Sequence, residues 1–335
     1  MTPATPGTRT RTPVPHRRST TAITLGVPAV MVAVVVAVAL SWRPELPDPI
    51  AIHWGPGGAA DRFGPFGPHV IAHGVIVMTF AAGLWAVGWF WGREAITRRF
   101  TAGAAVWFAG VLSGVLLGNL YIQRGLADAT EVGTADGPLA FAFGTATVAA
   151  LLAAWAVPGD RRQPTVAPLP EGARTLDLGR DEHATWVQEV GQEGLRIIAG
   201  GVLAFAVVMG AVTRQWAFVA AVTAALALLF AAVFRWTVTV DNNGLTARSM
   251  LRRPRVRVPL DEIVIAEEVQ VSPLREFGGW GLRTGRGGRT GVVVRKGSSL
   301  QVERTGGRVL VVTVDDAATG AALLNTLAAR ARTRG

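Results

Sequence analysis

The chain has 335 residues, of which 50% are hydrophobic, and it carries a formal net charge of +10. Because it contains no cysteine, disulfides and cysteine-based zinc or iron–sulfur sites are excluded. The positive charge is almost all arginine and lies beside apolar stretches, a distribution typical of inward-facing membrane loops, so we expect no nucleic-acid partner.

Six apolar stretches are each long enough to cross a bilayer, whose hydrocarbon core requires about 20 apolar residues in a helix. None carries Asp, Glu, Lys or Arg in its interior. Uninterrupted apolar runs favour helices over the alternating pattern of a membrane barrel. The sequence therefore predicts a membrane α-helical bundle with six transmembrane helices, over Thr21–Leu40, Val70–Trp91, Thr101–Ile122, Pro138–Val157, Leu195–Thr213 and Gln215–Phe234.

Arginine alternates between the segments that connect these stretches. Arginines lie in residues 1–20, a tail that we expect to be disordered, and in the second and fourth connections, whereas the first and third connections carry fewer arginines, which lie among Asp and Glu residues. By the positive-inside rule, both termini are cytoplasmic and the protein is a multi-pass protein of the plasma membrane. The first apolar run is too long for a signal peptide and lacks a clean cleavage site, so we expect it to be retained.

The first outward loop, residues 42–68, has the most specific sequence in the chain. Prolines hold its entry extended, and Ile50 and Ile52 alternate as in a short strand that ends at His53 and Trp54. The Gly57–Gly58 pair then predicts a tight turn. The loop resembles the membrane family known as domain of unknown function 1648, in which a transmembrane helix is followed by this pattern; here it reads Leu46, Pro47, His53, Trp54, Gly58 and Asp61. The resemblance covers roughly residues 25–92.

The same domain is found in proteins similar to the Sdp immunity family, bacterial membrane proteins that protect against a secreted toxin and can signal its presence. For this chain the resemblance implies a protein or peptide partner at the outer loop. His53 and Asp61 have three interpretations: they hold the glycine-rich loop together, they contact a ligand or toxin, or they bind a metal with His69 and His73. The first is favoured, and we predict no metal, no cofactor and no catalytic residues.

Two features of the middle of the chain concern packing. Gly110, Gly114 and Gly118 repeat at four-residue spacing, which favours close packing inside the bundle over a dimer interface, although the oligomeric state is not predicted. Residues 158–194 are rich in proline and predict a cytoplasmic linker, either loosely ordered or with a short strand around Leu176 and Leu178. Trp186 is interpreted as an anchor at the inner membrane face.

After Phe234 the hydrophobic period changes to two. Alternating strands, a turn at Asp241–Gly244 and a final amphipathic helix after Asp315 predict a cytoplasmic antiparallel β domain closed by one helix. The order resembles bacterial pleckstrin-homology-like (PH-like) domains. The predicted organisation is therefore a tail (1–20), a four-helix region with the motif loop (21–157), a linker (158–194), a transmembrane hairpin (195–234) and a PH-like β domain (235–335).

A glycine- and arginine-rich segment, residues 277–289, interrupts these strands. It lacks the sequence pattern of a nucleotide-binding loop. One interpretation is a solvated β-hairpin; the other is a contact with membrane lipids through Trp280, Arg283, Arg286 and Arg289.

Together these patterns predict a non-enzymatic membrane sensor, toxin-immunity or regulatory protein, with an outward motif loop and a cytoplasmic domain that binds lipid or protein. The alternative is a small-molecule permease or a permease subunit. The scarcity of polar residues in the apolar stretches favours the first.

Overall fold

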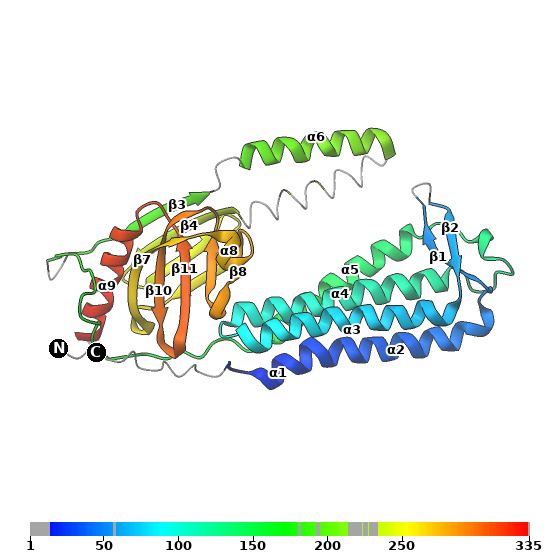
Figure 1. Cartoon of the computed structure of the whole chain (residues 1–335), viewed down its shortest axis with the longest axis horizontal. Helices are drawn as coiled ribbons and strands as arrows, with labels where there is room; N and C mark the ends of the chain where they lie inside the picture. Colours follow the sequence, from blue (N-terminus) through cyan, green and yellow to red (C-terminus); the bar gives the residue numbers. More distant parts are fainter. Residues whose placement is uncertain are drawn as a thin grey trace. The chain divides into compact units, whose positions relative to one another are not determined.

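The computed structural model describes residues 14–55, 58–179, 182–191, 195–213, 223, 227 and 234–333. Two compact units form, a helical unit (Val14–Asp160) and a sheet unit (Arg161–Gly335). Figure 1 shows the helices α1 to α5 of the first unit and the strands β3 to β11 of the second.

The helical unit begins with one nearly continuous helix, formed by α1 (Arg17–Thr21), a π-helical turn (Ala22–Gly26), α2 (Val27–Trp42) and a 3-10 turn (Arg43–Glu45). It continues with α3 (Phe66–Trp91), α4 (Ala95–Tyr121), a 3-10 turn (Ala129–Glu131) and α5 (Asp136–Ala156). The first helix starts at Arg17, inside the stretch that was predicted to be a tail.

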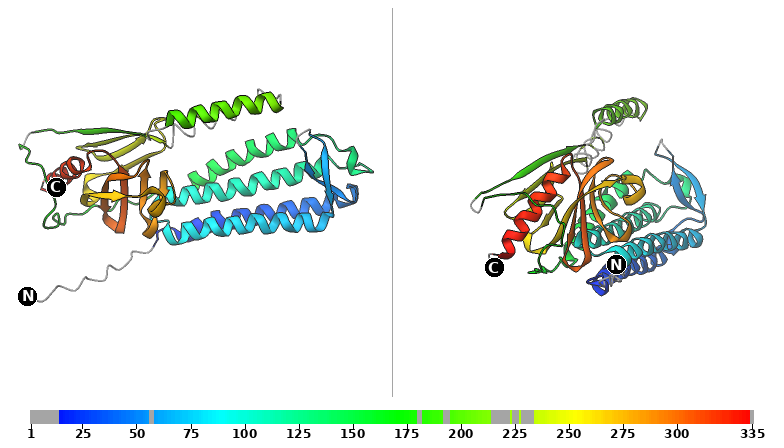
Figure 2. Two further views of the ribbon diagram at one scale, coloured as in Figure 1. Left: turned by 45° about the horizontal axis from the view of Figure 1, so that its top comes forward. Right: turned by 60° about the vertical axis from the view of Figure 1, so that its left-hand side comes forward.

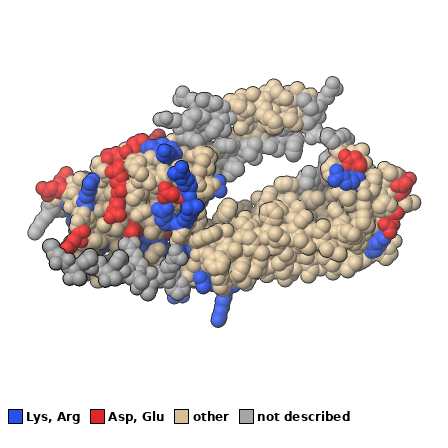
Figure 3. Space-filling model, viewed as in Figure 1, with Lys and Arg blue, Asp and Glu red and all other residues tan. Residues whose placement is uncertain are grey.

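Among the described residues, three helices are long and apolar enough to cross a membrane: Arg17–Glu45, Phe66–Trp91 and Ala95–Tyr121. Figure 3 shows a broad face of the helical unit that carries no charged side chains between its two ends. Shorter apolar helices cover Ala140–Ala156 in α5 and Gly200–Ala211 in α6 (Leu195–Thr213). The sixth predicted stretch, 215–234, lies almost entirely outside the described residues, so six crossings remain a prediction.

Small residues let α4 and α5 approach each other closely. A Cβ atom added to Gly110 would lie 2.9 Å from Cβ of Ala146, and one added to Gly114 would lie 2.6 Å from Cβ of Ala142. These two positions of the predicted glycine stripe are therefore used for packing inside the bundle.

Arg98, near the start of α4, is fully buried and joins the ends of three helices. Its guanidinium donates to the carbonyl oxygens of Gly92 (2.8 Å) and Pro158 (3.1 Å) and to the carboxylate of Asp160 (3.0 Å). That carboxylate also accepts from the N–H of Ala95 at 2.8 Å. Arg98 thus satisfies helix-terminal carbonyls that have no partner within their own helices.

The sheet unit contains two sheets and a final helix. Within the described residues, one sheet has the order β3-β4-β5-β6 and the other β7-β10-β11-β9-β8. The elements are β3 (Trp186–Gly191), β4 (Arg235–Asp241), β5 (Gly244–Ser249), β6 (Arg255–Val258), a 3-10 turn (Leu260–Glu262), β7 (Ile263–Val271), α8 (Pro273–Phe277), β8 (Gly281–Thr284), a 3-10 turn (Arg286–Gly288), β9 (Thr290–Val293), β10 (Gly297–Arg304), a 3-10 turn (Thr305–Gly307), β11 (Arg308–Thr313) and α9 (Ala317–Thr333).

Helix α9 packs against strands of both sheets, as Figures 1 and 2 show. Its Leu323, Leu324 and Leu327 are buried in one core together with Trp236, Leu300 and other side chains of both sheets. The predicted turn is also present, because Asp241 pairs with Gly244 in a β4–β5 hairpin. The predicted strands and closing helix are therefore present, and the PH-like identity of the domain stays a prediction.

The second sheet is mixed, which corrects the prediction of a purely antiparallel domain. Strand β9 pairs with β11 in parallel, from Thr290 opposite Leu310 to Val292 opposite Val312. The reason is topological, because β11 lies between β10 and β9 in the sheet. Both β11 and β9 run opposite to β10, so they are parallel to each other.

The sheet unit also includes residues that the sequence predicted as a linker. Strand β3 forms a six-pair antiparallel ladder with β4, from Trp186 opposite Val240 to Gly191 opposite Arg235. Trp186 is only 9% exposed and packs in the core, so its interpretation as a membrane anchor is wrong. The described residues 173–179 form no strand; instead, the N–H of Leu176 donates to the hydroxyl of Thr326 on α9 at 2.8 Å. Residues 192–234 are consequently an insertion between two neighbouring strands.

A buried ion cluster around Glu262 connects the segment that contains Gln163 to the second sheet. One carboxylate oxygen of Glu262 accepts from Arg304 (2.7 Å) and is 3.0 Å from the guanidinium of Arg308, and all three side chains are nearly inaccessible to solvent. The other oxygen accepts from the N–H of Gln163 at 2.9 Å. Burial alone would raise the pKa of Glu262, but the hydrogen bonds from Arg304 and Gln163 and the charges of both arginines outweigh it, so the pKa is lowered.

Candidate functional site

The motif loop folds into a β-hairpin at one end of the helical unit. Strands β1 (Ile50–Trp54) and β2 (Ala60–Gly64) pair antiparallel, with Ala51 opposite Phe63 and His53 opposite Arg62. Between them, the N–H of Gly58 donates to the carbonyl of Gly55 at 2.9 Å. Gly58 has a φ of +78°, which confirms the need for glycine at that position of the turn; Gly57 lies outside the described residues.

The two faces of the hairpin pack on different parts of the unit. Ile50 lies in a cluster with side chains of α2, α3 and α4, while Ala51 packs with Ala129 and Val132 of the α4–α5 connection. The motif residue Leu46 belongs to the first cluster, and Pro47 is buried beside it in the sequence. Both are therefore structural residues that hold the hairpin on the bundle.

Gln123 fastens the hairpin backbone to the end of α4. Its side-chain oxygen accepts from the N–H of Ala51 (2.6 Å), and its amide nitrogen donates to the carbonyl oxygens of Ala51 (3.1 Å) and Asn119 (2.8 Å). The side chain is fully buried. A buried amide that satisfies both polar groups of one strand residue acts like a neighbouring strand. The sequence reasoning missed this residue, because no local pattern links positions 72 residues apart.

His53 and Asp61 form a pair on the outer surface of this anchored hairpin. Nδ1 of His53 lies 2.6 Å from Oδ1 of Asp61, and the two side chains are 54% and 50% exposed. The space for the carboxylate depends on Gly55, because a Cβ atom there would lie 2.8 Å from Oδ2 of Asp61. The carboxylate orients the imidazole, so that Nε2 is the ring nitrogen left for a partner.

Trp54 ties the tip of the hairpin to the next outward connection. Its indole nitrogen donates to the carbonyl of Gly133 at 2.9 Å. The structure therefore gives Trp54 a hydrogen-bond partner within the protein. Two ion pairs also form in the segments that follow α2 and α4, Arg43 with Asp48 (2.7 Å) and Arg124 with Glu45 (2.8 Å). The hydrogen bond to Glu45 raises the pKa of Arg124.

The four residues considered as metal ligands do not gather at one place. His73 is buried inside the bundle, 3.5 Å from the hydroxyl of Ser113 on α4, whereas His53 is on the exposed hairpin. Within the described part of the chain, no group of three or more His, Cys, Asp or Glu side chains could hold a metal ion. The geometry of the hairpin thus provides a binding surface with one oriented imidazole and one carboxylate.

The glycine- and arginine-rich segment forms the predicted hairpin, since β8 pairs with β9, and a short helix, α8, precedes it. Gly285 of this segment and Gly291 of β9 make room for the buried ring of Phe277: Cβ atoms at these two positions would lie 2.6 Å and 2.4 Å from ring carbons. Packing against Phe277 therefore accounts for Gly285, one of the glycines of residues 277–289.

The arginines of this segment differ in their surroundings. Arg289 donates to Glu276 at 2.8 Å and lies over the ring of Phe277, so a protein carboxylate already balances its charge. Arg283 and Arg286 are exposed and Trp280 is half-buried, with Arg283 donating to the carbonyl of Trp280 at 3.0 Å. The lipid-contact hypothesis thus keeps two exposed cations and one aromatic ring.

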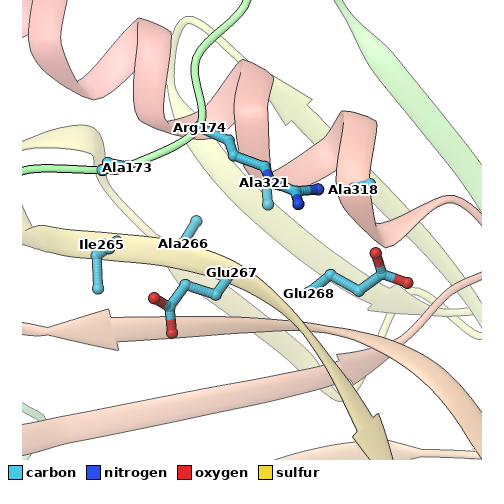
Figure 4. A pocket seen from close by; sticks show the side chains of 9 residues that line it. Ala173, Arg174, Ile265, Ala266, Glu267, Glu268, Ala318 and Ala321 are labelled. Carbon is cyan, nitrogen blue, oxygen red and sulfur yellow. The ribbon is translucent and has the colours of Figure 1, made fainter.

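A hollow of about 370 Å³ lies on the sheet unit between residues 172–174, β7 and α9 (Figure 4). Alanines, among them Ala266, Ala318 and Ala321, line it together with Arg174, Glu267 and Glu268. Because its wall combines one guanidinium with two carboxylates, it does not select ligands of one charge.

Comparison with known proteins gives one finding. Residues 29–72 match the model of a family described as a domain of unknown function, DUF1648. The match spans most of α2, the hairpin and the first part of α3, and it includes all six motif residues, which confirms the resemblance predicted from the loop. No curated protein and no solved structure matches the chain.

Proposed function

We propose that this chain is a multi-pass plasma-membrane protein of the non-enzymatic sensor, toxin-immunity or regulatory type. The β1–β2 hairpin faces the exterior and recognises a protein or peptide. The sheet unit is cytoplasmic, PH-like in strand order and closing helix, and binds lipid or protein. Six helices cross the membrane, with α5, α6 and residues 215–234 adding to the three long apolar helices, and both termini are cytoplasmic.

One observation carries this proposal: a half-exposed His53–Asp61 pair on a hairpin whose backbone is fastened to the bundle. A rigid support lowers the entropy lost when a partner binds, so a small polar surface can be selective. A histidine oriented by a carboxylate offers one directed hydrogen-bonding group. The arrangement therefore suits recognition of a peptide backbone or polar side chain.

Topology is tested first, with reporters in the full chain. A reporter fused after Gly335 should indicate the cytoplasm, and one placed at Asp136 the exterior. The same outcome is required by the arginine alternation. An exterior carboxyl terminus would remove the inside–outside assignment and with it the proposed function.

Recognition is tested in native membranes with a photo-crosslinking amino acid at Arg62, which is exposed and directly opposite His53. We expect a crosslinked partner that disappears with His53→Ala or Asp61→Ala at unchanged membrane abundance. Asp48→Ala is the matched control, because it removes another exposed carboxylate of the same loop. If both site variants keep the crosslink, or if they lose abundance, the pair has only a structural role.

The permease alternative is supported by one observation, the buried contact of His73 with Ser113 between α3 and α4. Ionisable residues inside a membrane bundle are costly and commonly mark substrate or proton pathways. Under this alternative, His73→Leu abolishes function while His53→Ala does not. The reverse outcome favours recognition at the hairpin.

A further inference from the structure

A second hollow, of about 440 Å³, lies at one end of the four-stranded sheet, where β3 ends, β4 begins and β5 ends. Its lining contains Arg235, Arg248 and Arg252 and a single carboxylate, that of Glu189. Three guanidinium groups against one carboxylate give this hollow a clear preference for anions.

The strand register increases this preference. Arg248 lies directly opposite Arg255 in the β5–β6 pair, and both side chains are exposed. Residues 244–260 contain five arginines and no Asp or Glu. Like charges directly opposite each other across two strands are destabilising, so an anion bound between them would stabilise the sheet.

The loop that joins β5 and β6 has a fixed shape and an apolar tip. The N–H groups of Ser249 and Arg252 donate to the carbonyl oxygens of Pro254 (3.1 Å) and Ser249 (2.8 Å). Arg252 has a φ of +64°, which is uncommon outside glycine. At the tip, Met250 is 58% exposed and Leu251 is 43% exposed. Apolar side chains flanked by arginines are typical of surfaces that enter the interface of a membrane.

The chain connectivity places this loop next to the apolar insertion. The chain leaves the sheet at Gly191 and re-enters it at Arg235, whose carbonyl accepts from the N–H of Met250 at 2.9 Å. Only three residues separate Gly191 from the start of α6 at Leu195, so their Cα atoms are at most about 14 Å apart. If α6 crosses the membrane, this end of the sheet therefore lies at the membrane surface.

We propose that this end of the sheet is a binding site for the phosphate groups of anionic lipids. Arg235, Arg248, Arg252 and Arg255 contact the headgroups, and Met250 and Leu251 enter the interface between headgroups and acyl chains. The proposal rests on the proposed function in one respect, the crossing of the membrane by α6. It names the ligand of the cytoplasmic domain and locates it away from the glycine- and arginine-rich segment.

The test uses the full chain, in which Leu251→Cys introduces the only cysteine and hence a single labelling site. An environment-sensitive fluorophore at position 251 is measured in nanodiscs of phosphatidylcholine with and without phosphatidylglycerol. We expect a blue shift and quenching by nitroxide lipids in the anionic nanodiscs, both weakened by salt. Asn243→Cys is the matched control, because Asn243 is exposed in the β4–β5 turn at the opposite end of the same sheet.

Charge variants in the Leu251→Cys background assign the site. Since each basic residue near an anionic surface contributes about fivefold to the membrane-bound population, replacing Arg248, Arg252 and Arg255 by Gln should lower that population about a hundredfold. Arg283→Gln with Arg286→Gln should leave it unchanged. Loss of the shift in this second variant would assign lipid binding to the glycine- and arginine-rich segment and overturn the proposal.

Two further outcomes are decisive. A shift in neutral nanodiscs on addition of inorganic phosphate alone would identify a site for free phosphate and refute the lipid assignment. A label at position 251 that stays in water, in a chain whose reporters show the proposed topology, would refute this inference alone. Reporters that place Gly335 outside would refute the proposed function itself.

Discussion

Replacing Glu262 by Gln should loosen the sheet unit more than any exposed charge substitution. The variant keeps the shape of the side chain and an oxygen that can accept from the N–H of Gln163. It removes the negative charge that Arg304 and Arg308 share. The side chains of these two arginines are only 6% and 5% exposed. Two guanidinium groups then remain buried without the carboxylate that they share.

The expected cost follows from that burial. Removing one partner of a buried ion pair typically costs about 3–5 kcal/mol, because the remaining charge is left uncompensated. Since about 1.36 kcal/mol corresponds to a factor of ten, the amides of the sheet should exchange with solvent roughly 150- to 5,000-fold faster. Asp261→Asn is the matched control: Asp261 also pairs with an arginine, Arg162 at 2.8 Å, but the side chains are 30% and 69% exposed. Exposed pairs contribute about 0–1 kcal/mol.

Hydrogen exchange of the full chain in detergent, followed by mass spectrometry of peptides from β10 and β11, measures this difference. The pH dependence supplies a second check. Because the pKa of Glu262 is lowered in the folded protein, its stabilisation is complete above the ordinary value of 4.5 and is lost as the pH falls towards the lowered value. The difference between the wild type and Glu262→Gln should therefore shrink as the pH falls below 4.5. Equal exchange in the Glu262 and Asp261 variants at pH 7 would refute the reasoning.

Two further predictions concern the helical unit. Gly114→Ala brings Cβ to 2.6 Å from Cβ and 3.0 Å from Cα of Ala142, so α4 and α5 must separate, and thermal unfolding in detergent should show a loss of stability of about 1–3 kcal/mol. The control Gly83→Ala, with no atom within 4 Å of the added Cβ, should be neutral or stabilising. Equal effects of the two substitutions would contradict the packing argument. Gln123→Leu leaves the N–H and carbonyl of Ala51 without their side-chain partner, which should destabilise the hairpin by about 1–3 kcal/mol for each buried group. Amides of the β1–β2 hairpin should then exchange with solvent faster, while the middle of α4 stays protected. Unchanged exchange at Ala51 would show that the hairpin does not depend on Gln123.

The sequence predicted the elements whose signals are local. Continuous apolar runs predicted α2 to α5, alternation predicted most of β4 to β11, and Asp241–Gly244 predicted the β4–β5 turn. Each signal comes from residues within one element or one turn, where periodicity and turn chemistry act. The motif loop was found in the same way, as a short pattern of residue types.

The interactions that were missed join residues far apart in the chain. Gln123 and Ala51 are 72 positions apart, and their hydrogen bonds depend on how α4 ends beside the hairpin. Trp186 and Val240 pair across the apolar insertion, so the strand that contains Trp186 has its partner in a distant part of the sequence. Glycine content likewise gave no indication that Gly285 and Gly291 accommodate the ring of Phe277. Such contacts are set by tertiary packing and have no signature in a local window.

The insertion of residues 192–234 between β3 and β4 has a consequence for biosynthesis. Strand β3 leaves the ribosome before the apolar segment, while its partner β4 follows about 40 residues later. At about 5–20 residues per second, β3 therefore waits some 2–9 seconds with Trp186 and Val190 uncovered. The ladder between β3 and β4 closes only when both ends of the insertion are on the same side of the membrane. Completion of the sheet thus depends on correct insertion, and a chain whose helices enter the bilayer wrongly keeps an unpaired, apolar strand that quality-control proteases can recognise.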